Sequence, residues 1–105
     1  MNAHDASVLA EFAGRLRRSL PQAKLWAFGS RTRDDATPES DLDICVVVDR
    51  LDRATRQLIR QIAWEVGFAN DMVITTVKYT RDTFEHGAAS VSPLVRTVLR
   101  EGVPA

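Results

Sequence analysis

Asp41 and Asp43, two aspartates separated by one residue, have the clearest capacity for chemistry in this sequence. They stand at the start of the β-branched apolar run 42–48, which predicts a strand. Alternate residues of a strand point to the same face, so the two carboxylates are expected side by side, with Cys45 beyond them. Neighbouring carboxylates repel each other unless a cation neutralises them, and hard oxygen ligands suit Mg²⁺. The pair therefore predicts a magnesium site; the alternative is a surface strand that simply begins with two aspartates.

A Gly-Ser pair precedes the aspartates and is a candidate for phosphate binding. It follows the apolar and aromatic run 24–28, which predicts another strand. A glycine lets a ligand approach the main chain, and the free N–H groups of a helix beginning at residue 30 would face a phosphate. An ordinary turn with solvated arginines is the alternative. The residues that the sequence assigns to phosphate binding are Gly29, Ser30, Arg31, Arg33 and Ser40.

A third carboxylate, Asp71, opens the apolar run 71–77, which also predicts a strand. If this strand lies beside run 42–48, Asp71 comes within reach of Asp43. A third carboxylate there would help to activate a hydroxyl nucleophile beside two metal ions. A turn formed with Asn70 is the alternative. The residues assigned to catalysis and to metal binding are Asp41, Asp43 and Asp71.

Helices are predicted between these strands from hydrophobic periodicity and capping residues. Asp52 is expected to cap the second helix, with Gly67 just past its end, and Thr80 to cap a short third helix. The predicted helices cover residues 5–19, 53–66, 80–87 and 93–101, the last opened by Ser92 and Pro93. These elements predict one α+β (α/β) domain over residues 1–105, with helices packed on a small mixed sheet.

Several side chains are predicted to have structural rather than chemical roles. Trp26 and Trp64 fall in apolar patterns and are predicted to be core residues, and Cys45 is predicted to be a packed thiol. The arginines of the second helix line one of its sides, which predicts a solvated face, with docking of an acidic partner as the alternative. These arginines are Arg53, Arg56 and Arg60.

The charges of the chain balance, with 14 Lys and Arg against 14 Asp and Glu. Strong nucleic-acid binding is therefore not expected, because it rests on neutralisation of phosphates by excess positive charge. One cysteine cannot form an internal disulfide, which fits a reducing compartment. No apolar run reaches the roughly 20 residues that span a bilayer. Since the first residues also lack the pattern of a secretion signal, a cytoplasmic location without membrane contact is expected.

The stretch GSRTRDDATPESDLDICVVVD resembles the signature of the DNA polymerase beta-type nucleotidyltransferase superfamily, in which a polar spacer separates Gly-Ser from Asp-x-Asp. The similarity is greatest to the minimal nucleotidyltransferase (MNT) branch and covers most of the chain. It implies the nucleotidyltransferase fold, with Gly29 and Ser30 on the β- and γ-phosphates of ATP. It also implies two Mg²⁺ ions bound by the Asp-x-Asp pair, with Asp71 as the third carboxylate of the family. Asp34 is a departure, because relatives often carry glycine after the arginine.

The resemblance implies transfer of AMP from ATP to a hydroxyl of a partner protein. MNT proteins of this size resemble antitoxins whose partner is an all-helical HEPN-domain ribonuclease, and a single small domain leaves the acceptor side open to such a partner. A docking antitoxin without activity is one alternative. Adenylylation of a small molecule such as an aminoglycoside, in a pocket built by a homo-oligomer, is the other.

Overall fold

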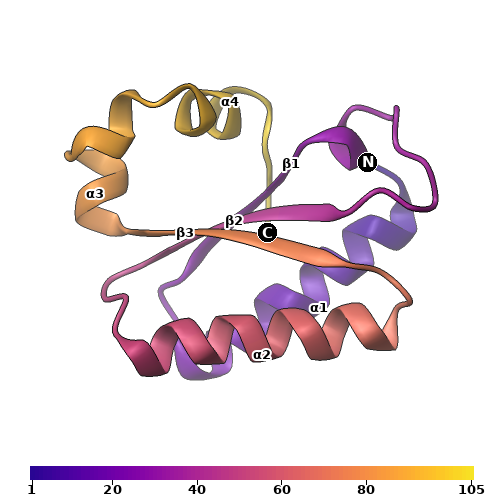
Figure 1. The fold of residues 1–105 in the computed structure, drawn as a ribbon, viewed down its shortest axis with the longest axis horizontal. Helices are drawn as coiled ribbons and strands as arrows, with labels where there is room; N and C mark the ends of the chain where they lie inside the picture. The colour runs from indigo at the N-terminus through magenta and orange to yellow at the C-terminus, as the bar shows by residue number, and fades with distance from the viewer.

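The computed structural model describes residues 1–105, and a four-stranded sheet runs through the middle of the molecule (Figure 1). The strands are β1 (Lys24–Phe28), β2 (Leu42–Val48), β3 (Ile74–Thr80) and β4 (Val103–Pro104). The helices are α1 (Ala3–Ser19), α2 (Arg53–Ala69), α3 (Arg81–Glu85) and α4 (Pro93–Glu101), with two 3-10 turns, η1 (Ser30–Thr32) and η2 (Ala88–Val91). The long helices α1 and α2 lie on one face of the sheet, and α3 and α4 lie on the other (Figure 1).

The strands follow the order β3-β2-β1-β4 across the sheet. β2 runs parallel to β3 and antiparallel to β1, and β4 runs antiparallel to β1. A parallel pair needs a crossover connection, and α2 provides it between β2 and β3. A mixed sheet with helices on both faces confirms the predicted fold class.

Buried side chains gather in two clusters, one on each face of the sheet. The larger holds 16 residues and the smaller 5, so most of the apolar surface is buried beneath α1 and α2. Alternation along β2 sends Leu42, Ile44, Val46 and Val48 into the larger cluster and Cys45 and Val47 into the smaller one. Asp43 therefore lies on the face of the smaller cluster. On this face α3 and α4 lie toward the C-terminal end of β2, so these two helices do not cover the first residues of the strand (Figure 1).

Cys45 is fully buried in the smaller cluster. Burial raises the pKa of its thiol to about 12, because the thiolate would lose its hydration there. The thiol is therefore neutral near pH 7, and the prediction of a packed core cysteine is confirmed.

Capping residues begin α2, α3 and α4 where the sequence predicts, whereas α1 begins at Ala3, two residues before its predicted start. The side chains of Asp52, Thr80 and Ser92 accept hydrogen bonds from backbone N–H groups three residues on. Pro93 occupies the first turn of α4, where its missing N–H costs no helical bond. None of these helices combines the length and the apolar character that a membrane crossing requires.

The boundary between α2 and β3 differs from the prediction. α2 continues to Ala69, and β3 begins only at Ile74. Gly67 lies inside the helix, where an added Cβ would come 2.5 Å from the backbone oxygen of Met72. This glycine therefore serves the close approach of the following chain and does not end the helix.

The two tryptophans differ in their surroundings. Trp26 is half-buried on β1, and its ring stacks on Phe84 with centroids 5.3 Å apart. Its predicted place at the core is confirmed. The prediction for Trp64 is wrong, because 68% of this residue is exposed on α2. Its position continues the apolar pattern of the helix, but no element of the chain covers that part of α2.

Val46→Ala tests this division of the core, because Val46 is fully buried on the central strand β2. The substitution is expected to lower the free energy of unfolding by about 1–3 kcal/mol through lost contacts and the cavity it leaves. Urea denaturation followed by circular dichroism measures the change. Val91→Ala is the matched control: Val91 is 65% exposed, and the change should stay within about 0.5 kcal/mol. Equal effects of the two substitutions would contradict the assigned core.

Candidate functional site

Gly29 brings the end of β1 directly against the carboxylate of Asp43. Its φ of +86° lies in the left-handed region that glycine adopts at no steric cost. A Cβ added at this position would stand 2.5 Å from Asp43 Oδ2. The site therefore requires glycine for two reasons, the backbone conformation and the space beside the carboxylate.

Thr75 holds the other oxygen of the same carboxylate. In the parallel register of β2 and β3, Thr75 is the residue opposite Asp43. The Thr75 hydroxyl donates a hydrogen bond to Asp43 Oδ1. Asp43 is half-buried and Thr75 is exposed. The Asp43 carboxylate is thus held between a hydroxyl on β3 and the Cβ-free face of Gly29.

Asp41 and Asp43 form a pair of acids without a basic partner. Asp41 is exposed directly before β2, and alternation along the chain directs it to the same face as Asp43. Neither carboxylate takes part in any ion pair of the chain. Two uncompensated carboxylates beside an open glycine backbone fit a hard divalent cation such as Mg²⁺ and a phosphate group bound to it.

Asp71 does not lie on β3 beside Asp43, and that prediction is wrong. It follows the last residues of α2 with a φ of +53°. Its N–H donates to the oxygen of Phe68, and the next N–H, of Met72, donates to the oxygen of Gly67 at 2.9 Å. This is the Schellman arrangement that ends a helix, and its left-handed position usually holds glycine or asparagine.

The three carboxylates predicted to bind metal consequently do not form one group. No cluster of three or more His, Cys, Asp and Glu side chains with metal-binding geometry occurs in the molecule. β3 presents Thr75 where the resemblance implied a third acid. Sequence reasoning missed Thr75 because the predicted strand 71–77 begins three residues before the observed one.

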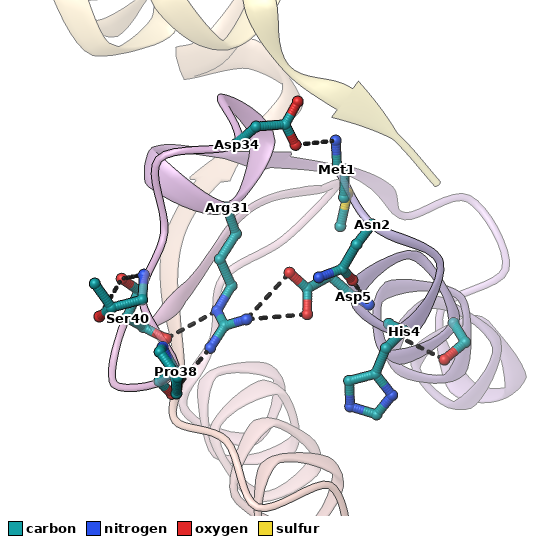
Figure 2. Close-up of polar contacts among 10 residues, drawn as sticks. Met1, Asn2, His4, Asp5, Arg31, Asp34, Pro38 and Ser40 are labelled. Carbon is teal, nitrogen blue, oxygen red and sulfur yellow. Dashed lines mark hydrogen bonds and ion pairs between the residues drawn. The ribbon is translucent and has the colours of Figure 1, made fainter.

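Arg31 points toward Asp5 of α1 (Figure 2). Its Nη1 lies 3.0 and 3.1 Å from the two carboxylate oxygens of Asp5, and both side chains are almost completely buried, with 9% and 3% exposed. Its Nε donates to the backbone oxygen of Ser40 at 2.8 Å and its Nη2 to that of Pro38 at 3.3 Å. Arg31 therefore fastens the loop before β2 to α1, a structural role in place of the predicted phosphate contact.

The other predicted phosphate ligands lie in the turns of this loop. Ser30 begins η1. The Ser40 hydroxyl accepts a hydrogen bond from the N–H of Thr37 at 3.0 Å, so it closes a turn ahead of Asp41. Arg33 is half-exposed, and its Nε lies 3.5 Å from the carboxylate of Asp35. Of the predicted phosphate-binding side chains, Ser30 and Arg33 are those not committed to holding the loop.

Asp34 has a backbone conformation that glycine adopts most easily. Its φ is +61°, again in the left-handed region, which aspartate tolerates better than most residues. Its carboxylate is exposed and lies 3.4 Å from the N-terminal amino group of Met1 (Figure 2). The backbone therefore accommodates aspartate at this position, and the Asp34 carboxylate forms an ion pair with the amino group of Met1.

Arg31→Gln is expected to destabilise the protein strongly. Removal of the guanidinium leaves the buried Asp5 carboxylate without its partner, which costs about 3–5 kcal/mol of unfolding free energy. Arg33→Gln is the matched control two residues away; its pair with Asp35 is exposed, so the loss should stay below about 1 kcal/mol. Thermal and urea denaturation give both values. A stable Arg31→Gln variant that fails only to bind nucleoside triphosphate would restore the phosphate-binding role.

Comparison with known proteins gives one matching family and several solved structures of similar fold. The profile of the nucleotidyltransferase domain family matches residues 9–101. A search of curated proteins gives no match. Chains of two mutants of the toxin–antitoxin complex MntA–HpeT are similar in structure: one has a TM-score of 0.59 and 20% identity over 99% of this chain and 72% of that chain. For the other mutant the TM-score is 0.60 and the identity 24%, over 92% of this chain and 70% of that chain.

A third solved structure is that of a tri-AMPylated HEPN toxin from Shewanella oneidensis in complex with an MNT antitoxin. The similar chain in it has a TM-score of 0.57 and 21% identity, over 95% of this chain and 70% of that chain. These similarities show a shared fold. Since the family profile extends over nearly all of the sequence, from α1 to the end of α4, this chain belongs to the nucleotidyltransferase domain family.

Proposed function

We propose that this protein transfers AMP from ATP, in the presence of Mg²⁺, to a hydroxyl group of a partner protein. The observation that carries the proposal is the Asp41 and Asp43 pair, which has no basic partner and whose Asp43 carboxylate lies against the Cβ-free backbone of Gly29. Membership of the nucleotidyltransferase domain family supports the reaction class.

The residues after β1 and at the start of β2 bind and orient the nucleotide. The backbone at Gly29 and the Ser30 hydroxyl contact the β- and γ-phosphates, and the open side of Gly29 lets them approach the main chain. Asp41 and Asp43 would hold Mg²⁺, which when bound would neutralise the triphosphate and lower the pKa of the attacking hydroxyl. Thr75 keeps Asp43 in one orientation, because its hydroxyl occupies one carboxylate oxygen.

The transfer exchanges one phosphorus–oxygen bond for another. A hydroxyl oxygen of the acceptor forms a bond to the α-phosphorus of ATP, and the bond from that phosphorus to the bridging oxygen breaks. Pyrophosphate leaves with the electron pair. The acceptor hydroxyl loses its proton to solvent or to a group of the partner, because β3 offers Thr75 rather than a carboxylate beside Asp43.

A HEPN-type toxin is the partner that the structural similarities favour. One similar structure contains a HEPN toxin described as tri-AMPylated in complex with an MNT antitoxin. Another is a mutant whose two substitutions replace aspartates two positions apart, the spacing of Asp41 and Asp43 in this chain. By analogy with these complexes, the present protein would act as the antitoxin of such a pair.

A docking antitoxin with little or no transferase activity is the second candidate. Thr75 is the observation that favours it, because a hydroxyl at this place can neither bind a metal as strongly as a carboxylate nor act as a general base near pH 7. The uncompensated pair Asp41 and Asp43 favours the enzyme, because a site that only docks gains nothing from two repelling acids.

ATP binding is expected to depend on Mg²⁺ through Asp43. Titration calorimetry should show measurable binding with Mg²⁺, and affinity lower by at least about tenfold in EDTA or in Asp43→Asn. The melting temperature of Asp43→Asn should not fall, because the substitution relieves repulsion between two acids. Equal affinity in Mg²⁺ and in EDTA would contradict the metal site.

Transfer itself is tested by intact-mass spectrometry of a purified HEPN toxin mixed with this protein, ATP and Mg²⁺. The toxin should gain the mass of one or more AMP groups. Asp41→Asn and Asp43→Asn should lower the rate by about 10²-fold or more, since both carboxylates organise the reacting phosphate.

Asp71→Asn is the matched control for these variants. The same substitution at the exposed end of α2 should leave the rate within a few-fold, because asparagine also suits the left-handed position. A loss at Asp71 as large as that at Asp43 would return it to the catalytic group. A toxin that is inhibited yet unmodified would leave the docking antitoxin as the function.

A further inference from the structure

A hollow of about 680 Å³ lies between the second half of α2, the start of β3 and the loop ahead of Asp41. We name it the α2–β3 groove, defined by Arg60, Trp64, Phe68, Val73, Ile74 and Thr76. Ile74 and Thr76 belong to the residues of β3 that alternate with Thr75, so this part of the groove lies on the opposite face of the strand from Asp43.

Three large apolar side chains of the groove are exposed to solvent. Trp64, Phe68 and Val73 are 68%, 77% and 62% exposed. The rings of Trp64 and Phe68, one helical turn apart, stack with centroids 5.3 Å apart and an angle of 15° between their planes. Single exposed apolar residues are ordinary, but a contiguous aromatic patch beside a hollow is typical of an interaction site.

β3 borders the groove as an open edge of the sheet. It is the first strand in the order β3-β2-β1-β4 and pairs only with β2. Over the seven residues of β3, the backbone groups that point away from β2 have no strand partner. Such an edge can accept an extended segment of another chain as an additional strand.

The charges differ along the groove: Glu39 and Asp71 line it near the start of β3, whereas the cations lie toward the end of β3. Arg56 and Arg60 stand one turn apart on α2 near Lys78 of β3, and none of the three has a carboxylate within ion-pair distance. Partial burial and repulsion from the two arginines lower the pKa of Lys78. Positive charges held together in this way are stabilised by carboxylates from outside the chain.

A segment of another chain that combines apolar side chains with carboxylates would satisfy both the apolar patch and these cations.

We infer that the α2–β3 groove docks an extended acidic segment of a partner protein, which pairs with β3 as a fifth strand. Its apolar side chains pack on Trp64 and Phe68, and its carboxylates pair with Arg56, Arg60 and Lys78. This interaction is separate from nucleotide transfer, and it stands whether or not the docked partner becomes modified.

The inference is tested with a fluorescent peptide in which glutamate alternates with valine and phenylalanine, measured by fluorescence polarisation with the complete protein. Saturable binding is expected, together with slower amide hydrogen exchange in β3. A peptide with lysine for glutamate should not bind. A peptide with one central proline should bind at least about tenfold more weakly, because proline removes a ladder donor.

Variants of the protein locate the binding surface. Arg60→Glu and Trp64→Ala should each weaken binding of the acidic peptide by at least about tenfold. Arg96→Glu is the matched control, since it reverses an exposed arginine of α4 on the other face of the sheet. Circular dichroism verifies that the variants are folded, and ATP binding verifies that the nucleotide site is intact.

Four results would overturn the inference. The first is the absence of saturable binding by the acidic peptide, and the second is equal weakening by Arg96→Glu and Arg60→Glu. The third is a concentration-dependent dimer, seen by sedimentation and broken by Trp64→Ala, which would identify a second copy as the occupant. Equal binding of the proline peptide would exclude pairing with β3 and thereby the proposed mode.

Discussion

The buried ion pair of Arg31 and Asp5 is the interaction on which the geometry of the site depends. The loop between β1 and β2 is polar and has little apolar surface to bury, so it could not hold one conformation through packing. Arg31 places its charge in the protein and satisfies it with both oxygens of Asp5 and two backbone oxygens of the loop. Such a pair adds little net stability over an apolar contact, but it strongly penalises any arrangement that separates its members. It therefore specifies where the loop lies, and hence where Gly29 and Asp41 stand.

The two faces of β2 have different roles. Its residues facing α1 and α2 are fully apolar, and this face anchors the strand in the larger core. On the opposite face the pattern changes along the strand, from Asp43 at the open end to Cys45 and Val47 beneath α3 and α4. The strand, held by the core, thus places the Asp43 carboxylate where water and ligands can reach it, and its charge is not fully buried.

The sequence predicts what depends on near neighbours and misses what depends on distant ones. The short helical turn at Ser30, the strand after Asp41 and the caps of α2, α3 and α4 follow from residues a few positions apart, and all are observed. A charged residue before an apolar run gives the same sequence pattern whether it begins a strand or ends a helix. The sequence therefore predicts Asp71 on a strand, although it lies at the end of α2. Arg31 meets Asp5 across 26 residues, and no local pattern indicates that contact. Trp64 fits an amphipathic helix, and only the absence of a covering element exposes it.

β3 is the element shared by the two surfaces of this protein. On one face, the Thr75 hydroxyl orients the Asp43 carboxylate, and on the other, β3 forms the open edge of the α2–β3 groove. A strand added to that edge would restrain β3 through backbone hydrogen bonds, and edge strands gain order when both sides are paired. The position of Thr75 relative to Asp43 would then be fixed more firmly in the complex than in the free protein. The hydroxyl orients the carboxylate through one hydrogen bond, so this orientation depends directly on how firmly the strand that carries Thr75 is held.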